Sequence, residues 1–513
     1  MEEILVKENH EPQKNNLKQY TAPISDAMDN YARDGALAFH TPGHKQGLGA
    51  HPRLQRLITP QGLKQEVSLM EELDDLHGPE GCIKEAQELA AQLWDARESF
   101  FIINGTTGAI QAMLLGTLSP GDKVLLPRNA HRSIVGGVIL AGLIPAYVEP
   151  EQSVELGIAL GLSYNAVAKA IKANPEAKAL VAVYPVYYGY GSDLTSLAQL
   201  VHQHNMLLLV DEAHGAHLKF SSELPQQALD CGADVVAQST HKLLGSMTQT
   251  SMLHIGKNSR VESSAVAKAA GLLQSTSPNQ LLLASLDIAR LQMAQEGRER
   301  LAKALELSRW LREKVGGIAG LKSPGVEYCQ DGLDSGACCL DETKVMVDVQ
   351  GLGITGMEAE YQLRYTYKVQ CELSDPQNLL FIISMADTKE TVTALVQALQ
   401  QLSDQYHGQL ATGQADRGGK ITQGAIPSPQ QAMSPREAFF ATDQAVLLEE
   451  AVGKIAGETV AFYPPGIPVL CPGEIITAEV VAYIRYHQSL GLRVSGAADN
   501  SLKYIRIIGE TNE

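Results

Sequence analysis

Between about residues 95 and 260, short apolar runs alternate with segments whose apolar residues recur at helical spacing. The apolar runs cover residues 100–103, 123–127, 179–184, 206–210 and 233–237. Parallel strands need long crossover connections, which are usually helices, so this alternation predicts an α/β fold with a large, mainly parallel sheet. Ligands of such sheets bind beyond the carboxyl ends of the strands. The residues that directly follow each run are therefore the first candidates for a functional site.

The chain of 513 residues is long enough for two or three domains. The large domain is expected to end in a long amphipathic helix from Leu281 to about Val315. Residues 404–432 are rich in Gly, Gln, Ala and Pro, a composition typical of linkers. The predicted parts are a polar arm at 1–20, a large domain at 21–315, a small α+β domain at 316–403, a linker at 404–432 and a small C-terminal α+β domain at 433–513.

Acidic residues outnumber basic ones by 58 to 41, which gives a formal net charge of −17. A main partner that is nucleic acid is not expected, because phosphate backbones require positive surfaces. Seven cysteines, an odd number without a C-x-x-C pair, predict free thiols in a reducing compartment. The first residues contain no apolar signal core, and no segment approaches the length of a membrane span. We therefore expect a cytoplasmic protein without membrane contact.

The run 233–237 leads into Ser239, His241 and Lys242, with Leu243 directly behind them. A lysine after a strand is usually a solvated surface residue. Semi-apolar surroundings, however, disfavour the charged form of an amine, and a neutral lysine amine condenses with an aldehyde to form a Schiff base. Our hypothesis is that Lys242 carries pyridoxal phosphate (PLP). This hypothesis requires an acid partner, a phosphate-binding turn and a group that stacks on the cofactor ring.

Asp211 stands at the tip of the apolar run 206–210. A buried acid is costly unless it meets a cation, and a protonated pyridine nitrogen is such a cation. Lys242 follows 31 residues later, a length that predicts one crossover helix and a return strand between the two residues. Asp211 is therefore the predicted partner of the cofactor ring.

A turn rich in glycine and hydroxyl groups, 104–109, connects the first apolar run to a helical segment. Backbone N–H groups at a helix start can bind a phosphate, and the hydroxyls of Thr106 and Thr107 add donors. A threonine-capped helix without a ligand is the alternative. The turn is not a P-loop, because no Gly-Lys-Ser/Thr follows it. His131, just past the run 123–127, is either a flat ring that stacks on a pyridine or a surface or capping histidine.

The loop at 39–47 contains His40 and His44 among turn-forming residues. Its spacing matches no common zinc pattern, so no metal site is predicted. The loop is either the edge of an active site or a plain surface turn.

Residues 211–214 spell Asp-Glu-Ala-His, the DEAH box of nucleic-acid helicases. That class requires a Walker A loop, G-x-x-x-x-G-K-[ST], and the chain contains none. The acidic charge balance also argues against a helicase.

With these pieces in place, the sequence resembles the Orn/Lys/Arg decarboxylases, PLP enzymes of the aspartate-aminotransferase-like fold. The resemblance extends from about residue 20 to the C-terminus. The similar stretches are HTPGHK at 40–45, LDDLH at 73–77, NGTT at 104–107, RNAHRS at 128–133, STHK at 239–242, TSP at 276–278, and YPPGIP at 463–468 with PGE at 472–474. Each motif alone is moderately specific, whereas their common order is highly specific.

The resemblance implies roles for the candidate residues. Lys242 would form the Schiff base with PLP and later transfer a proton. Asp211 would pair with the pyridinium nitrogen, and His131 would stack on the ring. Further cofactor contacts are implied for Gly105, Thr106, Thr107, Ala213, His214, Ser239 and His241.

The resemblance also implies a homodimer as the smallest active unit. In the family a hydroxyl of the neighbouring subunit completes the phosphate site, and Thr276 or Ser277 matches it. Glu474 would face the distal cation of the substrate, with His40 and His44 also at the substrate site.

The implied reaction is decarboxylation of a basic amino acid in polyamine metabolism. Arginine is favoured over lysine or ornithine, and the products are agmatine, cadaverine or putrescine, together with CO₂. Larger members carry an N-terminal wing domain, whereas only about 20 residues precede the core here, so wing-dependent rings are not expected. His214 stands where several larger members have an aromatic residue.

Two alternatives use the same cofactor. An aminotransferase of this fold would clamp the substrate α-carboxylate with an arginine, and Arg364 is a candidate by position, although its neighbours Tyr365, Thr366 and Tyr367 do not match the aminotransferase pattern. A PLP-binding protein that has lost catalysis is the second alternative.

Overall fold

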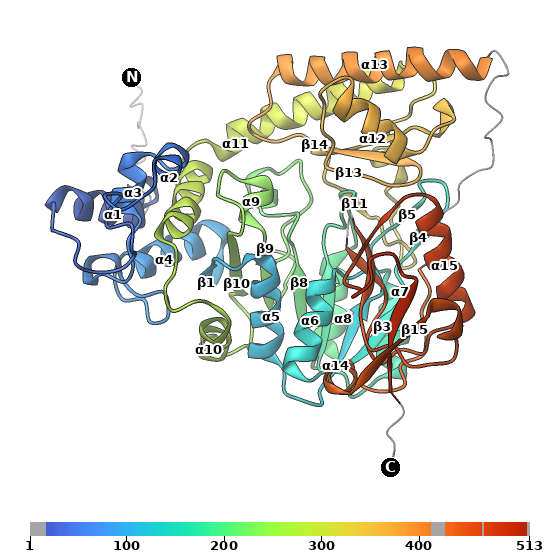
Figure 1. Ribbon diagram of the computed structural model, residues 1–513, viewed down its shortest axis with the longest axis horizontal. Coiled ribbons are helices and arrows are strands. Elements are labelled where there is room, and N and C mark those ends of the chain that lie inside the picture. The colour runs from blue at the N-terminus through green and yellow to red at the C-terminus, as the bar shows by residue number, and fades with distance from the viewer. Residues whose placement is uncertain (1–16, 412–425, 464–465, 510–513) are drawn as a thin grey trace, which may run out of the picture.

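A seven-stranded sheet forms the centre of the computed structural model, which describes residues 17–411, 426–463 and 466–509 (Figure 1). The strands, in spatial order, are β1 (Ala96–Ile102), β10 (Ser251–Gly256), β9 (Val235–Gln238), β8 (Leu207–Asp211), β6 (Ala179–Val183), β2 (Lys123–Pro127) and β3 (Ile144–Val148). Neighbours from β9 to β3 are parallel, and β10 runs antiparallel to both β9 and β1. The predicted mainly parallel sheet is confirmed, and each predicted apolar run forms one of its strands.

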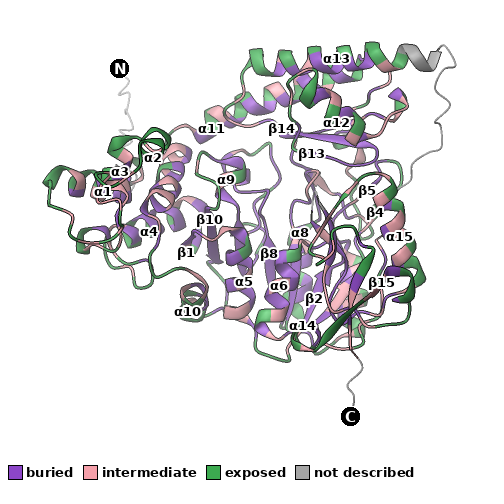
Figure 2. Cartoon of the chain, viewed as in Figure 1, coloured by how far each residue is buried: buried purple, intermediate pink, exposed green. Residues whose placement is uncertain are grey.

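Both faces of the sheet are covered by helices, which explains why its strands are almost continuously apolar. Along β8, Leu208 and Val210 belong to one hydrophobic core, whereas Leu207 and Leu209 belong to the other. The first core includes α4 (Cys82–Trp94), α7 (Tyr164–Ala173), α8 (Leu194–Gln203) and α11 (Gln280–Gly316), and the second includes α5 (Gly105–Thr117), α6 (Arg132–Ala141) and α10 (Ser263–Leu273). Figure 2 shows the buried strands between these layers.

The connection from β8 to β9 differs from the sequence prediction. The return strand is present as β9, but residues 212–234 contain only a 3-10 turn, Leu218–Phe220, in place of the expected crossover helix. Gly215 lies so close to Glu212 that an added Cβ would be 2.5 Å from its Cγ, and Pro225 and Gly232 interrupt any longer helix. The chain therefore crosses between the two strands in irregular backbone.

The N-terminal segment packs its helices α1 (Pro23–Asp34), α2 (Pro52–Leu57) and α3 (Pro60–Gln65) beside α4 and α11 (Figure 1). A fully buried ion pair between Arg290 and Asp287 anchors it, because Asp287 accepts from the Ile24 N–H at 3.1 Å and Arg290 donates to the Gln19 carbonyl at 2.9 Å. Within the predicted polar arm, residues 17–20 form a 3-10 helix, and residues 1–16 lie outside the described chain.

The predicted long helix is α11, which extends from the N-terminal helices to a small domain (Figure 1). That domain contains β12 (Lys344–Asp348), α12 (Gly356–Tyr365), β13 (Leu373–Ser374), β14 (Asn378–Ile382) and α13 (Lys389–Ala411). Two short pairs, β4 (Gln152–Ser153) with β5 (Ile158–Ala159) and β7 (Tyr190–Gly191) with β11 (Cys339–Leu340), lie in the connections. Since α13 continues to residue 411, the linker predicted from residue 404 begins inside a helix. Residues 412–425 of that linker lie outside the described chain.

The C-terminal domain has its own hydrophobic core. Its elements are α14 (Pro435–Phe440), β15 (Asp443–Leu447), β16 (Val460–Tyr463), β17 (Ile467–Leu470), α15 (Ala478–Ser489), β18 (Arg493–Ser495) and β19 (Tyr504–Ile508). It packs beside the β2–β3 side of the large sheet, and α14 contacts α6 (Figure 1). Residues 464 and 465 of the YPPGIP stretch are not among the described residues.

All seven cysteines are free thiols, as the sequence predicted. Within the ranges that the structure describes, no helix combines the length and the apolar character needed to cross a bilayer.

Candidate active site

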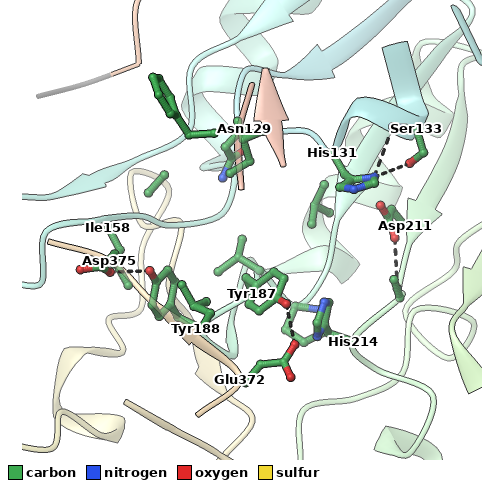
Figure 3. A pocket seen from close by; sticks show the side chains of 18 of the residues that line it. Asn129, His131, Ser133, Ile158, Tyr187, Tyr188, Asp211, His214, Glu372 and Asp375 are labelled. Atoms are coloured by element: carbon green, nitrogen blue, oxygen red, sulfur yellow. Dashed lines mark hydrogen bonds between the residues drawn. The ribbon is translucent and has the colours of Figure 1, made fainter. Parts of the chain in front are cut away.

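A cavity of about 1040 Å³ lies beyond the carboxyl ends of β2, β6, β8 and β9. The large domain supplies most of its wall, the segment 372–376 of the small domain closes one side, and side chains of the C-terminal domain, including Phe462 and His487, line another. Figure 3 shows how the polar side chains project into this space. The position agrees with the expectation that ligands bind at strand ends in sheets of this kind.

Lys242 lies on α9 (Thr240–Leu243), a single helical turn that directly follows β9. Its side chain is exposed into the cavity, and its Nζ is 2.9 Å from Nε2 of His214. Desolvation by the surrounding protein lowers the pKa of Lys242, while Asp211 and Glu372 oppose that change. The geometry therefore provides an amine that loses its proton more readily than a surface lysine.

Asp211 is the last residue of β8, and its carboxylate is buried at the cavity wall. Its Oδ1 accepts a hydrogen bond from the Ala213 N–H at 3.1 Å. Burial raises the pKa of Asp211, and the nearby ammonium of Lys242 partly offsets that effect. A cation bound in the cavity would stabilise the ionised carboxylate.

His131 is the N-cap residue of α6 and lines the cavity near Asp211 (Figure 3). Its Nδ1 accepts from the Ser133 N–H at 3.2 Å, so the neutral ring carries its proton on Nε2. Burial, followed by the charges of Lys242 and Arg132, lowers the pKa of His131 to about 4. A neutral, flat ring is the form that suits stacking on an aromatic ligand.

The predicted anion-binding turn forms one corner of the cavity at the start of α5. Gly105 has φ +76° and donates its N–H to the Gln249 carbonyl at 2.8 Å. The hydroxyl of Thr106 contacts the hydroxyl of Ser239 and lies 3.0 Å from Oγ of Ser251. This corner offers a helix N-terminus and clustered hydroxyls, which are donors suited to a phosphate.

The structure brings most of the predicted cofactor contacts together. The cavity is lined by Gly105, Thr106, Thr107, His131, Asp211, Ala213, His214, Ser239, His241 and Lys242. An amine, a buried acid, a neutral imidazole and an anion-binding corner can together hold an aromatic aldehyde that carries a phosphate. His214 Nδ1 has no hydrogen-bond partner among the described residues, so the cavity wall retains an unused polar atom.

Four predicted site residues do not line this cavity within the single chain. His40 lies 2.8 Å from the Tyr31 hydroxyl, and His44 pairs with Glu66 at 2.7 Å, both in the N-terminal segment. Thr276 and Ser277 are exposed in the loop between α10 and α11. Thr276 and Ser277 would therefore have to act in the cavity of a partner subunit, if they act at an active site.

Glu474 is the fifth predicted site residue outside the cavity. We expected it to face the distal cation of the substrate, and the structure corrects that expectation. The residue is fully buried, it does not line the cavity, and its carboxylate forms a two-point ion pair with Arg128. Its Oε2 also accepts from the Cys471 N–H at 2.7 Å. With both oxygens occupied inside the chain, Glu474 has no free face for a substrate cation.

Sequence reasoning missed two tyrosine–acid pairs in the cavity (Figure 3). The Tyr187 hydroxyl donates to Oε1 of Glu372 at 2.6 Å, and Tyr188 donates to Asp375. The Tyr187 ring also packs on the His214 ring with 4.2 Å between centroids. Glu372 and Asp375 follow their tyrosines by more than 180 residues and lie in the small domain, so no local pattern could have identified them.

Within the described parts of the chain, no group of three or more His, Cys, Asp or Glu side chains is arranged to hold a metal ion.

Comparison with known proteins finds two family matches in the chain. The family described as "Orn/Lys/Arg decarboxylase, major domain" matches residues 22–391, and "Orn/Lys/Arg decarboxylase, C-terminal domain" matches residues 420–500.

Similar proteins cover nearly the whole chain. The chain is 40% identical to the arginine decarboxylase of Bacillus anthracis, over 96% of this chain and 98% of that protein. It is 39% identical to the arginine decarboxylase of Bacillus subtilis, over 96% and 99%. Among solved structures, the lysine decarboxylase of Francisella novicida has a TM-score of 0.83 at 21% identity, with 96% of this chain and 82% of that chain covered.

Proposed function

Because this chain belongs to the Orn/Lys/Arg decarboxylase family and is an amino-acid carboxy-lyase, we propose that its main substrate is arginine, which it converts to agmatine and CO₂ with PLP as cofactor. One observation carries the proposal: the Lys242 amine faces a cavity whose wall also contains Asp211 and the neutral ring of His131. The preference for arginine over lysine or ornithine is supported by relatives of that activity at about 40% identity over nearly full length.

The residues of the cavity fit PLP. Lys242 would hold the aldehyde carbon, and the corner of Thr106, Thr107 and Ser239 would bind the phosphate through N–H and hydroxyl donors. Asp211 has a buried carboxylate with a raised pKa, so a protonated ring nitrogen would provide the cation that stabilises its charge. When bound, PLP supplies an electron sink for the pair released as the bond between Cα and the carboxylate breaks.

The protein side chains have separate tasks in this reaction. Asp211 would keep a proton on the ring nitrogen of bound PLP, and His131 stays neutral because burial and neighbouring charges lower its pKa to about 4. Lys242 moves a proton at Cα, since its pKa is lowered and its Nζ has an imidazole neighbour, His214, at 2.9 Å. The apolar walls from Val186, Ile467 and Val469 exclude water and favour loss of the carboxylate charge.

A homodimer with shared active sites is part of the proposal. Thr276 and Ser277 are exposed, and neither lines the cavity of its own chain. Beside His40, Phe39 leaves 92% of its surface exposed, and Leu37 and Leu48 are similarly uncovered. Large apolar side chains that are exposed within one short segment are compatible with a surface that a partner covers. Free cysteines throughout the chain support a cytoplasmic location.

An aminotransferase is less well supported. Among the described residues that line the cavity there is no arginine, and Arg364 lies exposed on α12 outside it. A site without this clamp holds the substrate α-carboxylate weakly, which suits its release as CO₂. The complete set of Lys242, Asp211 and His131 at one cavity argues against a PLP-binding protein without catalysis.

The decisive experiment measures CO₂ release by PLP-loaded protein with arginine, lysine and ornithine in parallel, and identifies each amine by mass. We expect agmatine as the main product. Reduction with borohydride followed by peptide mapping should place the cofactor mass on the peptide that contains Lys242, and Lys242→Ala should lose both signals. Transfer of the amino group to a keto acid without CO₂ would instead identify an aminotransferase.

A further inference from the structure

Three acidic side chains line the cavity: Asp211, Glu372 and Asp375. A basic amino acid brings a distal cation into this space, and a desolvated cation needs a carboxylate partner. Asp211 already has a role at the cofactor ring. The distal cation therefore has two remaining candidates within the described chain.

Asp375 is saturated by its own surroundings. Its Oδ1 accepts from the N–H groups of Gln377 and Asn378, each at 2.7 Å, and the Asn378 amide and the Tyr188 hydroxyl donate as well. The residue is buried, and burial raises its pKa despite these bonds. Its role is to hold the segment before β14 in place.

Glu372 has the opposite character. It is exposed on the cavity wall one residue before β13, and no Lys, Arg or His nitrogen of the described residues comes within 4 Å of its carboxylate. Among the described residues, its carboxylate accepts one side-chain hydrogen bond, from the Tyr187 hydroxyl to Oε1 at 2.6 Å. Oε2 therefore remains available to a ligand, while Tyr187 sets the direction of the carboxylate.

The position of Glu372 relative to the reacting amine follows from a short chain of contacts. The Tyr187 ring packs on His214 at 4.2 Å, and Nε2 of His214 is 2.9 Å from Nζ of Lys242. The negative charge of Glu372 acts on Lys242 and partly opposes the lowering of its pKa by desolvation. Glu372 is thus connected to Lys242 through the side chains of Tyr187 and His214, and Figure 3 shows its carboxylate beside the Tyr187 hydroxyl and His214.

We propose that Glu372, on the small domain, is the carboxylate that binds the distal cation of the substrate and excludes amino acids with neutral side chains. The inference rests on the proposed decarboxylation of a basic amino acid and assigns its specificity to a residue other than Glu474. Tyr187 is a positioning residue, because its hydroxyl orients the carboxylate and its ring stays beside His214.

The test compares arginine with citrulline, in which a neutral ureido group replaces the guanidinium at nearly the same size. In the wild type, kcat/KM should favour arginine strongly. Glu372→Gln should lower that ratio by roughly ten- to a hundredfold, because a hydrogen bond to a charged group is lost, and kcat/KM for citrulline should stay near its wild-type value. Binding of agmatine, measured by calorimetry, should weaken by a similar factor.

A length-compensation experiment provides the second variant. Glu372→Asp withdraws the carboxylate by about one methylene, and homoarginine extends the substrate by one. This variant should therefore raise the ratio of kcat/KM for homoarginine to that for arginine. Tyr187→Phe should give an intermediate loss of discrimination, because it keeps the charge and removes the bond that directs it.

The matched control is Glu313→Gln, which neutralises an exposed glutamate paired with Lys314 at the far end of α11. It should leave the arginine-to-citrulline ratio unchanged. An unchanged ratio in Glu372→Gln, with wild-type enzyme active on arginine, would overturn the assignment of Glu372. If wild-type protein released CO₂ from none of the three basic amino acids, the proposed function itself would fail.

Discussion

Arg128 and Glu474 form a fully buried, two-point ion pair that joins the large domain to the C-terminal domain beside the cavity. Nη1 of Arg128 is 2.7 Å from Oε1 and Nη2 is 3.2 Å from Oε2, and Nη2 also donates to the Val469 carbonyl at 2.8 Å. Burial raises the pKa of Glu474, and the guanidinium opposes that shift. Because Arg128 directly follows β2, the pair fixes the C-terminal domain against the strand that leads to His131.

Removing one partner of this pair should destabilise the protein strongly. Arg128→Met leaves the Glu474 carboxylate buried without a cation, which typically costs about 3–5 kcal/mol. The denaturant midpoint monitored by far-UV circular dichroism should fall accordingly, and the double variant Arg128→Met with Glu474→Leu should recover part of it. The matched control is Arg506→Met, which breaks an exposed pair with Asp443 and should cost at most about 1 kcal/mol. Equal effects of the two single variants would contradict this account.

Lys344 should hold the cavity wall in place at His214. It is completely buried, its Nζ is 2.7 Å from Asp341 and 3.3 Å from the His214 carbonyl, and His217 lies 3.0 Å from the same Asp341. Burial alone would raise the pKa of Asp341, but Lys344 and His217 outweigh it and hold the pKa below its usual value. Lys344→Met should therefore lower the melting temperature markedly and weaken PLP retention, whereas the exposed Lys303→Met should change neither. A wild-type melting temperature in Lys344→Met would mean that the cluster of Lys344, Asp341 and His217 does not stabilise the fold.

Glu212 should make stability decrease as pH rises. Its side chain is buried beside the cavity, accepting from the Ala228 N–H at 2.7 Å and the Gln238 amide at 2.6 Å, and burial raises its pKa to about 8 from a usual 4.5. The folded chain thus binds a proton that the unfolded chain releases at lower pH. Its contribution to the free energy of unfolding is complete below pH 4.5 and is lost between pH 4.5 and about pH 8.

Glu212→Gln removes that titration, so the free energy of unfolding measured from pH 5 to pH 9 should show a smaller decrease in the variant than in the wild type. Glu313→Gln, on the surface, should retain the wild-type slope. Parallel wild-type and Glu212→Gln profiles would show that Glu212 is ionised in the folded protein.

Mixed dimers should reveal whether Thr276 and Ser277 act in the partner's site. The double variant Thr276→Ala with Ser277→Ala and the single variant Lys242→Ala should each be nearly inactive. In a symmetric dimer with shared sites, an equal mixture should regain about a quarter of wild-type activity, because half of the dimers are mixed and each has one intact site. Mixing Lys242→Ala with Asp211→Ala should regain nothing, since both residues serve the same site from one chain. If both mixtures stayed inactive, the hydroxyls of Thr276 and Ser277 would act in the active site of their own chain.

Much of the fold was predictable because its determinants are local. The strands β2, β6 and β8 are buried on both faces, so each is a continuous apolar run that a reader of the sequence can find. The helix α11 was predicted almost to its ends, because its buried side chains recur at helical spacing. Lys242, Asp211 and His131 were predicted because each stands at or shortly after the end of a strand, and parallel strands bring their carboxyl ends together at one edge of the sheet.

The sequence by itself therefore determined the sheet, the long helix and three residues that line the cavity, through periodicity and strand ends. Only the tertiary structure decided where the acidic side chains point. Glu474 meets Arg128 across 346 residues, and Glu372 meets Tyr187 across 185, so the partner that occupies or frees each carboxylate is absent from its local sequence. The missing crossover helix between β8 and β9 has a local cause instead, because Gly215 packs against Glu212 three residues earlier and Pro225 and Gly232 interrupt any longer helix.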